Sequence, residues 1–327
     1  MIQMSVDSSL YFKIFQEHRP SLEDLNKKRR AVLAELQVVL EAPVISYMAN
    51  ILHPYSAMNQ LDVDAMVNFI QYYSKKDERT YLIIESPGGD VNVAVKLVKM
   101  LRAVFPKGFS VIVPSVAKSA ATMLVLGADE IVVGPSSELG LIDPQMIMFT
   151  GNPQQPFAVI SARFIIRFIE NAKREISGNL NLVNVYYPLL QQLRPDHIEM
   201  AQEAIEMSKE YAKELLRQGL MKGASDDEIN KVVDYLSGEG LHALHESPIT
   251  YDKIKNLGMN VAYWDQDDPR WVKVLEYYFR VKAFFQINPN VTKIIETPNE
   301  SMIQQVQFIQ IPQQASQQPP PVASTKQ

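Results

Sequence analysis

Three short segments that are apolar without interruption alternate with helical patterns, and this order restricts the fold more than any other feature of the chain. The apolar segments span residues 81–84, 110–113 and 130–133. Helical patterns occupy residues 91–104 and 117–127 between them. Strands that are apolar on both faces must be covered on both sides, so the alternation predicts an α/β fold with a parallel sheet between helices.

Changes in composition divide the chain of 327 residues into four parts. We expect an N-terminal helical segment at 1–41 and a main domain at 42–290, with a helical insertion at about 160–240. A short strand-like extension at 291–311 follows. Residues 312–327 are rich in Gln and Pro. They carry too little apolar surface to offset the entropy lost on ordering, so we expect them to be disordered.

Composition also excludes several classes of function. The chain has no cysteine, which excludes disulfides, a thiolate nucleophile and cysteine-ligated metals. Its formal net charge of −5 disfavours a nucleic-acid partner. No window approaches the roughly 18 uninterrupted apolar residues of a transmembrane helix, and residues 1–20 lack the pattern of a signal peptide. We therefore expect a cytoplasmic protein, with peripheral association with a membrane left open.

The loop Ser-Pro-Gly-Gly-Asp at 86–90 ends the first apolar segment. Adjacent glycines allow positive φ angles and close approach of a ligand. The N–H groups of Gly88 and Gly89 precede a helix, where they can face an anion or a developing oxyanion. The alternative is a plain strand-to-helix turn. The loop lacks the lysine and hydroxyl residue of a phosphate-binding P-loop.

Ser119 follows the second apolar segment and begins a helix of small residues. At such a position the helix dipole lowers the energy of an alkoxide. Ala120 and Ala121 leave room for a substrate chain. The alternative is that Ser119 only caps the helix. Residues 115–118 also fit the Ser-x-x-Lys pattern of penicillin-recognising enzymes, but Ser115 falls at a strand end rather than in a helix.

A third loop, at 134–145, follows the third apolar segment and contains Asp143 near its end. Asp143 either lines the wall of a cleft or is a turn residue before proline. Successive parallel strands end at the same edge of a sheet, which is where ligands bind in open α/β folds. We therefore expect the three loops to converge on one cleft.

These segments together resemble the ClpP/crotonase superfamily. The glycine pair within 85–90 resembles its oxyanion segment, and Ser119, about thirty residues further on, resembles its nucleophile. Residues 128–132 and 139–145 resemble the next strand and loop of the SppA-like branch. The chain most resembles the serine dehydrogenase proteinase family, a Clp-fold group of predicted serine peptidases, over about residues 40–285.

The resemblance implies a spiral β/α fold of the ClpP/crotonase type with additional C-terminal helices. It implies a serine endopeptidase that cleaves a peptide or protein substrate through an acyl-enzyme on Ser119. The oxyanion hole would consist of the N–H of Gly88 or Gly89 and that of Ala120, with Asp143 in the cleft wall. A homo-oligomer is implied as well, and neither a cofactor nor a metal is.

The general base stays open at this point. The ClpP histidine has no counterpart, because the matching region reads Leu-Ile-Asp at 141–143. Lys173 is a candidate for a Ser–Lys pair, with a surface lysine as the alternative. His242 and His245 would share one face of a helix and could supply a base, pair on a metal or have a structural role. The remaining histidines, predicted to be structural, are His18, His53 and His197.

Two other functions are compatible with these residues. A catalytically inactive Clp-fold protein, acting as an oligomeric scaffold or peptide-binding module, would explain the missing base. Crotonase-like chemistry on an acyl thioester would use the same oxyanion hole. A serine at a helix start suits acyl transfer better than enolate stabilisation.

Overall fold

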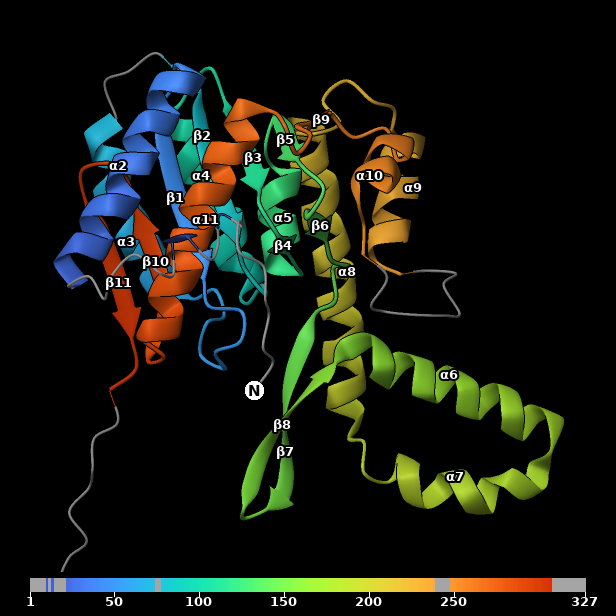
Figure 1. Ribbon diagram of the computed structural model, residues 1–327. Helices are drawn as coiled ribbons and strands as arrows, with labels where there is room; N and C mark the ends of the chain where they lie inside the picture. The colour runs from blue at the N-terminus through green and yellow to red at the C-terminus, as the bar shows by residue number, and fades with distance from the viewer. Residues whose placement is uncertain (1–9, 11–12, 15–21, 74–77, 239–247, 308–327) are drawn as a thin grey trace, which may run out of the picture.

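The computed structural model describes residues 22–73, 78–238 and 248–307, together with residues 10, 13 and 14. Its centre is a seven-stranded sheet in the order β11-β10-β1-β2-β3-β5-β9 (Figure 1). The strands are β1 (Val44–Ala49), β2 (Thr80–Glu85), β3 (Phe109–Val113), β5 (Glu130–Val133), β9 (Val261–Tyr263), β10 (Val291–Glu296) and β11 (Ser301–Gln305). Strands β1, β2, β3, β5 and β9 are parallel to one another, whereas β10 pairs antiparallel with β1 and β11 pairs antiparallel with β10. The predicted α/β class is therefore confirmed.

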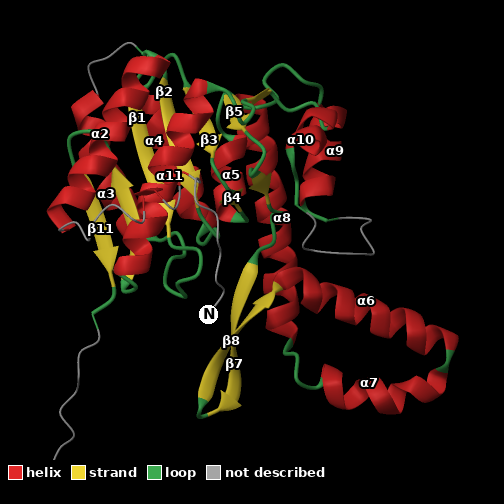
Figure 2. Cartoon of the chain, in the orientation of Figure 1, coloured by secondary structure: helices red, strands yellow, loops and turns green. Residues whose placement is uncertain are grey.

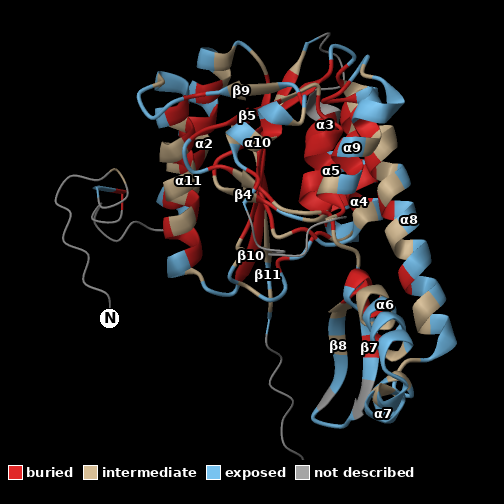
Figure 3. Cartoon of the chain, turned by 90° about the vertical axis from the view of Figure 1, so that its right-hand side faces the viewer, coloured by how far each residue is buried: buried red, intermediate tan, exposed pale blue. Residues whose placement is uncertain are grey.

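Two helical layers cover the sheet (Figures 2 and 3). On one face, α2 (Leu22–Leu40) and α11 (Pro269–Ile287) bury one set of strand side chains. The other face packs against a larger set of helices. These are α3 (Gln60–Tyr73), α4 (Val91–Val104), α5 (Ala120–Leu126), α8 (Pro195–Gln218), α9 (Asp226–Leu236) and α10 (Tyr251–Asn256). Because both faces are covered, alternate residues of each central strand enter two separate cores.

The expected helical insertion consists of α6 (Ala162–Gly178), η1 (Leu180–Leu182), α7 (Val183–Leu190), α8 and α9. Of these, α8 and α9 pack against the central domain, whereas α6 and α7 extend away from it (Figures 1 and 3). The Ser161 hydroxyl caps α6 by accepting from the Phe164 N–H. None of the described helices is long and apolar enough to cross a membrane.

A hairpin of β7 (Gln145–Asn152) and β8 (Gln155–Ser161) precedes α6 and was not predicted from the sequence. Its strands alternate, with Met146 and Met148 buried against α6 and α8 and Ile147 and Phe149 exposed. This period of two is the usual signature of a half-buried strand. The hairpin connects the loop containing Asp143 to α6.

The C-terminal residues expected as a short extension contribute two strands to the central sheet. Strand β10 pairs with β1, and β11 pairs with β10 at the sheet edge. The Arg29 guanidinium of α2 joins the buried Glu296 carboxylate at 3.0 Å, and the Tyr277 hydroxyl of α11 donates to the same carboxylate at 2.7 Å. The expected tail at 312–327 lies outside the described residues.

Candidate active site

The three loops meet at the carboxyl ends of β2, β3 and β5, as predicted. The short strand β4 (Val116–Ala117) lies between the glycine loop and β6 (Glu138–Leu139). The Ser86 N–H donates to the Val116 carbonyl, and the Ser86 carbonyl accepts from the Lys118 N–H, both at 3.1 Å. Gly140 then donates to the Ala117 carbonyl at 2.9 Å. The segment before Ser119 is thus fixed from both sides by backbone hydrogen bonds.

Ser119 has a strained backbone, with φ 51° and ψ −118°, at the start of α5. Its hydroxyl makes no capping hydrogen bond to the helix. By contrast, the Asp90 carboxylate caps α4 by accepting from the Asn92 N–H at 2.8 Å. Ser119 is half-buried and lines a cavity of about 790 Å³. The serine is therefore available to the cavity rather than used as a helix cap.

The glycine loop packs directly against the Ser119 segment. Gly88 has φ 98°, and a Cβ placed on it would lie 2.8 Å from the Ser119 Cβ and 2.5 Å from the Lys118 carbonyl oxygen. Gly89 has φ 147°, and a Cβ there would overlap the backbone of Met58. Only glycine fits these two positions, because a side chain at Gly88 would separate the loop from Ser119 and one at Gly89 would separate it from Met58.

Two backbone N–H groups at this junction, those of Gly89 and Ala120, have no hydrogen-bond acceptor among the described residues. The Gly88 N–H is already engaged, because it donates to the Ser86 hydroxyl at 3.1 Å. The Gly88 carbonyl accepts from the Met58 N–H at 2.7 Å. In a planar trans peptide the next N–H points the opposite way, so the Gly89 N–H is directed away from Met58. Between the two glycines, the geometry thus favours Gly89 as an oxyanion donor.

Asp143 lies in the wall of the same cavity. Its carboxylate accepts from the Ser161 hydroxyl at 2.7 Å and lies 4.0 Å from the Arg163 Nε. Lys118, next to Ser119 in the sequence, pairs with Glu138 at 3.1 Å and does not line the cavity. The apolar lining comprises Ile51, Pro54, Ala57, Pro87, Val91, Ala120, Met123, Ile142, Pro144, Ile147, Val159, Ala204 and Met207.

The candidate bases differ in their relation to the cavity. Lys173 is exposed on α6 and is not among the residues that line it. His242 and His245 lie outside the described residues. On their N-terminal side, the Leu236 carbonyl accepts from the N–H of Ile142, which lines the cavity, at 2.9 Å. On their C-terminal side, Ile249 exchanges two hydrogen bonds of 3.0 Å with Leu139, which precedes Ile142 in the chain.

His53 also lines the cavity, which the sequence analysis missed by taking it as structural. It follows the carboxyl end of β1, so the rule that located the other three loops could have found it. Its Nδ1 accepts from the Tyr55 N–H at 3.1 Å, which places the proton of a neutral ring on Nε2. In this form His53 offers a donor to the cavity. The described residues contain no group of three or more potential metal ligands.

Comparison with protein families agrees with the expected resemblance. Residues 10–159 match the family of ClpP-like SDH-type serine proteinases. The resemblance to this family is therefore confirmed, and the match contains the glycine loop, Ser119 and Asp143.

Curated relatives include two uncharacterized proteins of Methanocaldococcus jannaschii. One is 29% identical over 186 residues, covering 57% of this chain and 54% of the relative. The other is 26% identical over 198 residues, covering 60% of this chain and 56% of the relative. The chain spans about half the length of the curated relatives it matches.

Similar solved structures include two proteases. A mutant of the membrane-bound stomatin-specific protease 1510-N matches at 12% identity with a TM-score of 0.40, covering 66% of this chain and 78% of that one. The ClpP protease catalytic domain from Plasmodium falciparum matches at 10% identity with a TM-score of 0.37, covering 72% of this chain and 93% of that one.

Proposed function

We propose that the protein is a serine endopeptidase that hydrolyses peptide bonds through an acyl-enzyme on Ser119. One observation carries the proposal: Ser119 lies at the wall of a cavity, in a strained conformation, beside the unengaged N–H groups of Gly89 and Ala120. A hydroxyl and two backbone donors around one cavity are what acyl transfer requires. The match to a family of ClpP-like serine proteinases agrees with this assignment.

The reaction would proceed in two stages. The Ser119 oxygen attacks the scissile carbonyl carbon while its proton passes to a base, and the carbonyl oxygen becomes an oxyanion that accepts from Gly89 and Ala120. The intermediate then expels the amine, which takes the proton. A water molecule hydrolyses the resulting ester and restores the Ser119 hydroxyl. Loss of one oxyanion donor typically lowers such rates by about 10²–10³.

For the base we propose one of His242 and His245. The described residues that flank them, Leu236 and Ile249, are hydrogen-bonded to Ile142 in the wall of the cavity and to Leu139, which lies just before it in the chain. His53 lines the cavity, but its Nδ1 is occupied and its Nε2 carries the proton of the neutral ring. Lys173 is exposed on α6, away from the residues that line the cavity.

Covalent labelling with a fluorophosphonate probe tests the function. We expect the wild-type protein to be labelled at Ser119 and the Ser119→Ala variant to be unlabelled, with circular dichroism showing that both are folded. Ser208 is a matched control, because it lines the same cavity and is buried. Ser208→Ala should keep the labelling. A folded wild type that takes up no label at Ser119 would contradict the proposal.

A non-catalytic peptide-binding module or scaffold is the second candidate. It is favoured by the described part of the cavity lining, which offers His53 with its basic nitrogen occupied and no lysine. In that case Ser119→Ala should bind peptides as well as the wild type does. The labelling experiment separates the two candidates, because a module without a nucleophile takes up no label.

We also propose that the protein is a homo-oligomer. Helix α7 is rich in apolar residues, yet none of its residues is buried within the chain. The side chains of Val185 and Tyr187 are both 59% exposed. Apolar surface of this kind is commonly covered by a partner. A peptide or protein substrate and a cytoplasmic location remain predictions from the sequence.

A further inference from the structure

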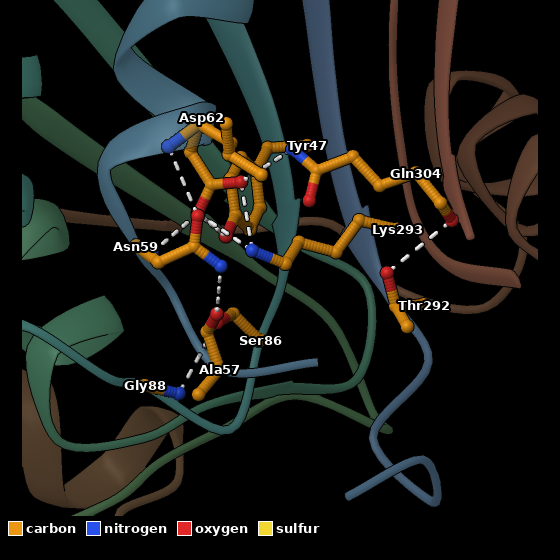
Figure 4. A network of polar contacts seen from close by, with 10 residues as sticks. Tyr47, Ala57, Asn59, Asp62, Ser86, Gly88, Thr292, Lys293 and Gln304 are labelled. Atoms are coloured by element: carbon orange, nitrogen blue, oxygen red, sulfur yellow. Dashed lines mark hydrogen bonds and ion pairs between the residues drawn. The ribbon is translucent and has the colours of Figure 1, made fainter. Parts of the chain in front are cut away.

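A buried network of polar side chains lies behind the glycine loop (Figure 4). Its centre is the completely buried Asp62, in the first turn of α3. The Lys293 ammonium of β10 lies 2.7 and 2.8 Å from the two carboxylate oxygens, and the Gln304 amide of β11 donates to one of them at 2.9 Å. The mechanism proposed above uses none of these groups.

One branch of the network leads from Asp62 to the N–H of Gly88. The Tyr47 hydroxyl donates to Asp62 at 2.9 Å. The buried Ser86 hydroxyl interacts with the Tyr47 phenol and by itself lowers the pKa of that phenol, and the Gly88 N–H donates to the Ser86 oxygen at 3.1 Å. Burial, followed by the charge of Asp62, raises the pKa of Tyr47 well above its usual value. The phenol therefore remains protonated and donates to Asp62.

A second branch leads from Asp62 to the carbonyl of Gly88. The Asp62 carboxylate accepts from the Asn59 N–H at 2.8 Å. The adjacent residue, Met58, donates its N–H to the Gly88 carbonyl at 2.7 Å and accepts from the Asp90 N–H at 3.0 Å. Asp62 thereby fixes the segment that holds the Gly88 carbonyl, and with it the peptide plane between Gly88 and Gly89.

The two branches hold the Gly88 backbone at both its N–H and its carbonyl. Rotation of the Gly88–Gly89 peptide would break at least the bond to Met58, and rotation of the preceding peptide would break the bond to Ser86. Because the peptide is planar, the orientation of the Gly88 carbonyl also fixes that of the Gly89 N–H. Buried, fully paired networks of this kind are rigid, since an unpaired group would be costly in a low dielectric.

We propose that Ser86 and Asp62 are positioning residues that orient the Gly89 N–H toward the oxyanion formed at Ser119. The inference rests on the proposed function, because the oxyanion that this donor would stabilise is the one formed by acyl transfer at Ser119. It also gives β10 and β11 a role in the active site, since Lys293 and Gln304 hold Asp62. Both strands lie beyond residues 10–159, the part that matches the family.

The first test compares Ser86→Ala with Ser137→Ala, using the full chain and a fluorophosphonate probe over a range of concentrations. Ser137 is a matched control, because its buried hydroxyl also accepts from a glycine N–H, that of Gly134 at 2.8 Å. Ser86→Ala should lower the maximal labelling rate about tenfold, less than the loss of a whole oxyanion donor, and leave the half-saturating probe concentration unchanged. Ser137→Ala should leave both values unchanged.

The second test removes one hydroxyl further from the reacting atoms. Tyr47→Phe interrupts the first branch, and Tyr277→Phe removes a buried hydroxyl on the opposite face of the sheet, where it contacts Ser46 and Glu296. Both variants should lower the melting temperature. Only Tyr47→Phe should slow labelling and shift the amide signal of Gly89 in spectra of protein labelled with ¹⁵N-glycine.

The outcomes separate the two proposals. A wild type that is labelled at Ser119, with a Ser86→Ala variant labelled equally fast and an unmoved Gly89 signal, would overturn the positioning role alone. A folded wild type that is not labelled overturns the proposed function, and the positioning role with it. The inference would also be overturned if Ser137→Ala were labelled as slowly as Ser86→Ala, or Tyr277→Phe as slowly as Tyr47→Phe. The slower labelling would then reflect general destabilisation.

Discussion

The region around Ser119 and the segment from β7 to α7 differ in how far their apolar side chains are buried and their polar groups hydrogen-bonded within the chain. Around Ser119, every residue of α5 is buried. The Thr122 hydroxyl lies 2.9 Å from both the Ala117 and the Gly140 carbonyl oxygens. In the segment from β7 to α7, Ile147 and Phe149 are 73% and 70% exposed, and α7 buries none of its residues. Figure 3 shows the same contrast as buried and exposed surface.

The first region is held together within one chain, and the exposed apolar residues of the second are what led us to propose an interface between copies there. Backbone and side-chain hydrogen bonds hold the three loops of the candidate active site without a partner. A helix of eight residues is marginal by itself, and α7 derives little support from apolar burial within this chain. The predictions below test this division, beginning with the proposed base.

The largest effect is expected for the proposed base. If His242 or His245 takes the proton of Ser119, its replacement by Gln should lower the labelling rate by about 10²–10⁴ and remove the acidic limb of its pH profile. His53→Gln is the control and should keep that limb, because its Nδ1 is already engaged by Tyr55. A lost limb in His53→Gln, with both other variants fully active, would move the base to His53.

A second large effect is expected for Gly88→Ala. A Cβ at this position would collide with Ser119 and Lys118 at a φ of 98°, so the loop must move away from the nucleophile. Labelling should fall by about 10² or more, as when an oxyanion donor is lost. Gly223→Ala is the matched control, since Gly223 has φ 91° and open space around it. It should lose stability by about 1 kcal/mol and keep its activity.

The glycine loop and the nucleophile show which parts of the candidate site could be predicted from the sequence. The glycine pair and Ser119 could be located because each follows a buried strand, and parallel strands end at one edge. Their mutual contact follows from that topology. His53 and the alternation at Met146–Phe149 obey equally simple rules and were overlooked. His53 and the hairpin strand could therefore also have been predicted from the sequence.

The network behind the glycine loop could not be predicted in this way. Lys293 and Asp62 are 231 positions apart and belong to no motif. Their pairing depends on β10 entering the sheet beside β1, and this requires an antiparallel return of the chain after α11. A buried lysine in a strand gives no local signal of its partner. Such contacts follow from tertiary packing, whereas the strand-end loops follow from local sequence.

The exposed region should respond to changes that leave the active site intact. Val185→Glu combined with Tyr187→Glu places two negative charges on α7. We expect self-association to weaken at least about tenfold, because association would then bury unpaired charge. Light scattering over a concentration series measures this. Val38→Glu is the control, because Val38 is also an exposed apolar residue, on α2. Unchanged association in the α7 variant would indicate that α7 is not the interface.

The smallest effect concerns stability as a function of pH, and its sign differs between a buried carboxylate near the active site and an exposed one just after α7. Burial raises the pKa of Glu85, at the end of β2, despite the nearby Lys282. Just after the exposed segment, a hydrogen bond from Arg194 lowers the pKa of Asp196, at the start of α8. Folding therefore favours the protonated form of Glu85 and the charged form of Asp196.

The sign of each contribution follows from proton binding. Between its unfolded and folded pKa, Glu85 holds more protons in the folded state, so its contribution to stability is complete below the unfolded pKa and is lost as pH rises. For Asp196 the contribution is present above the unfolded pKa and is lost as pH falls, and solvent screening keeps it small. Urea unfolding across pH 3–8 should show that Glu85→Gln removes part of the decline in stability with rising pH, whereas Asp196→Asn does not. The same slope in wild type and Glu85→Gln would mean that Lys282 compensates fully for the burial of this carboxylate.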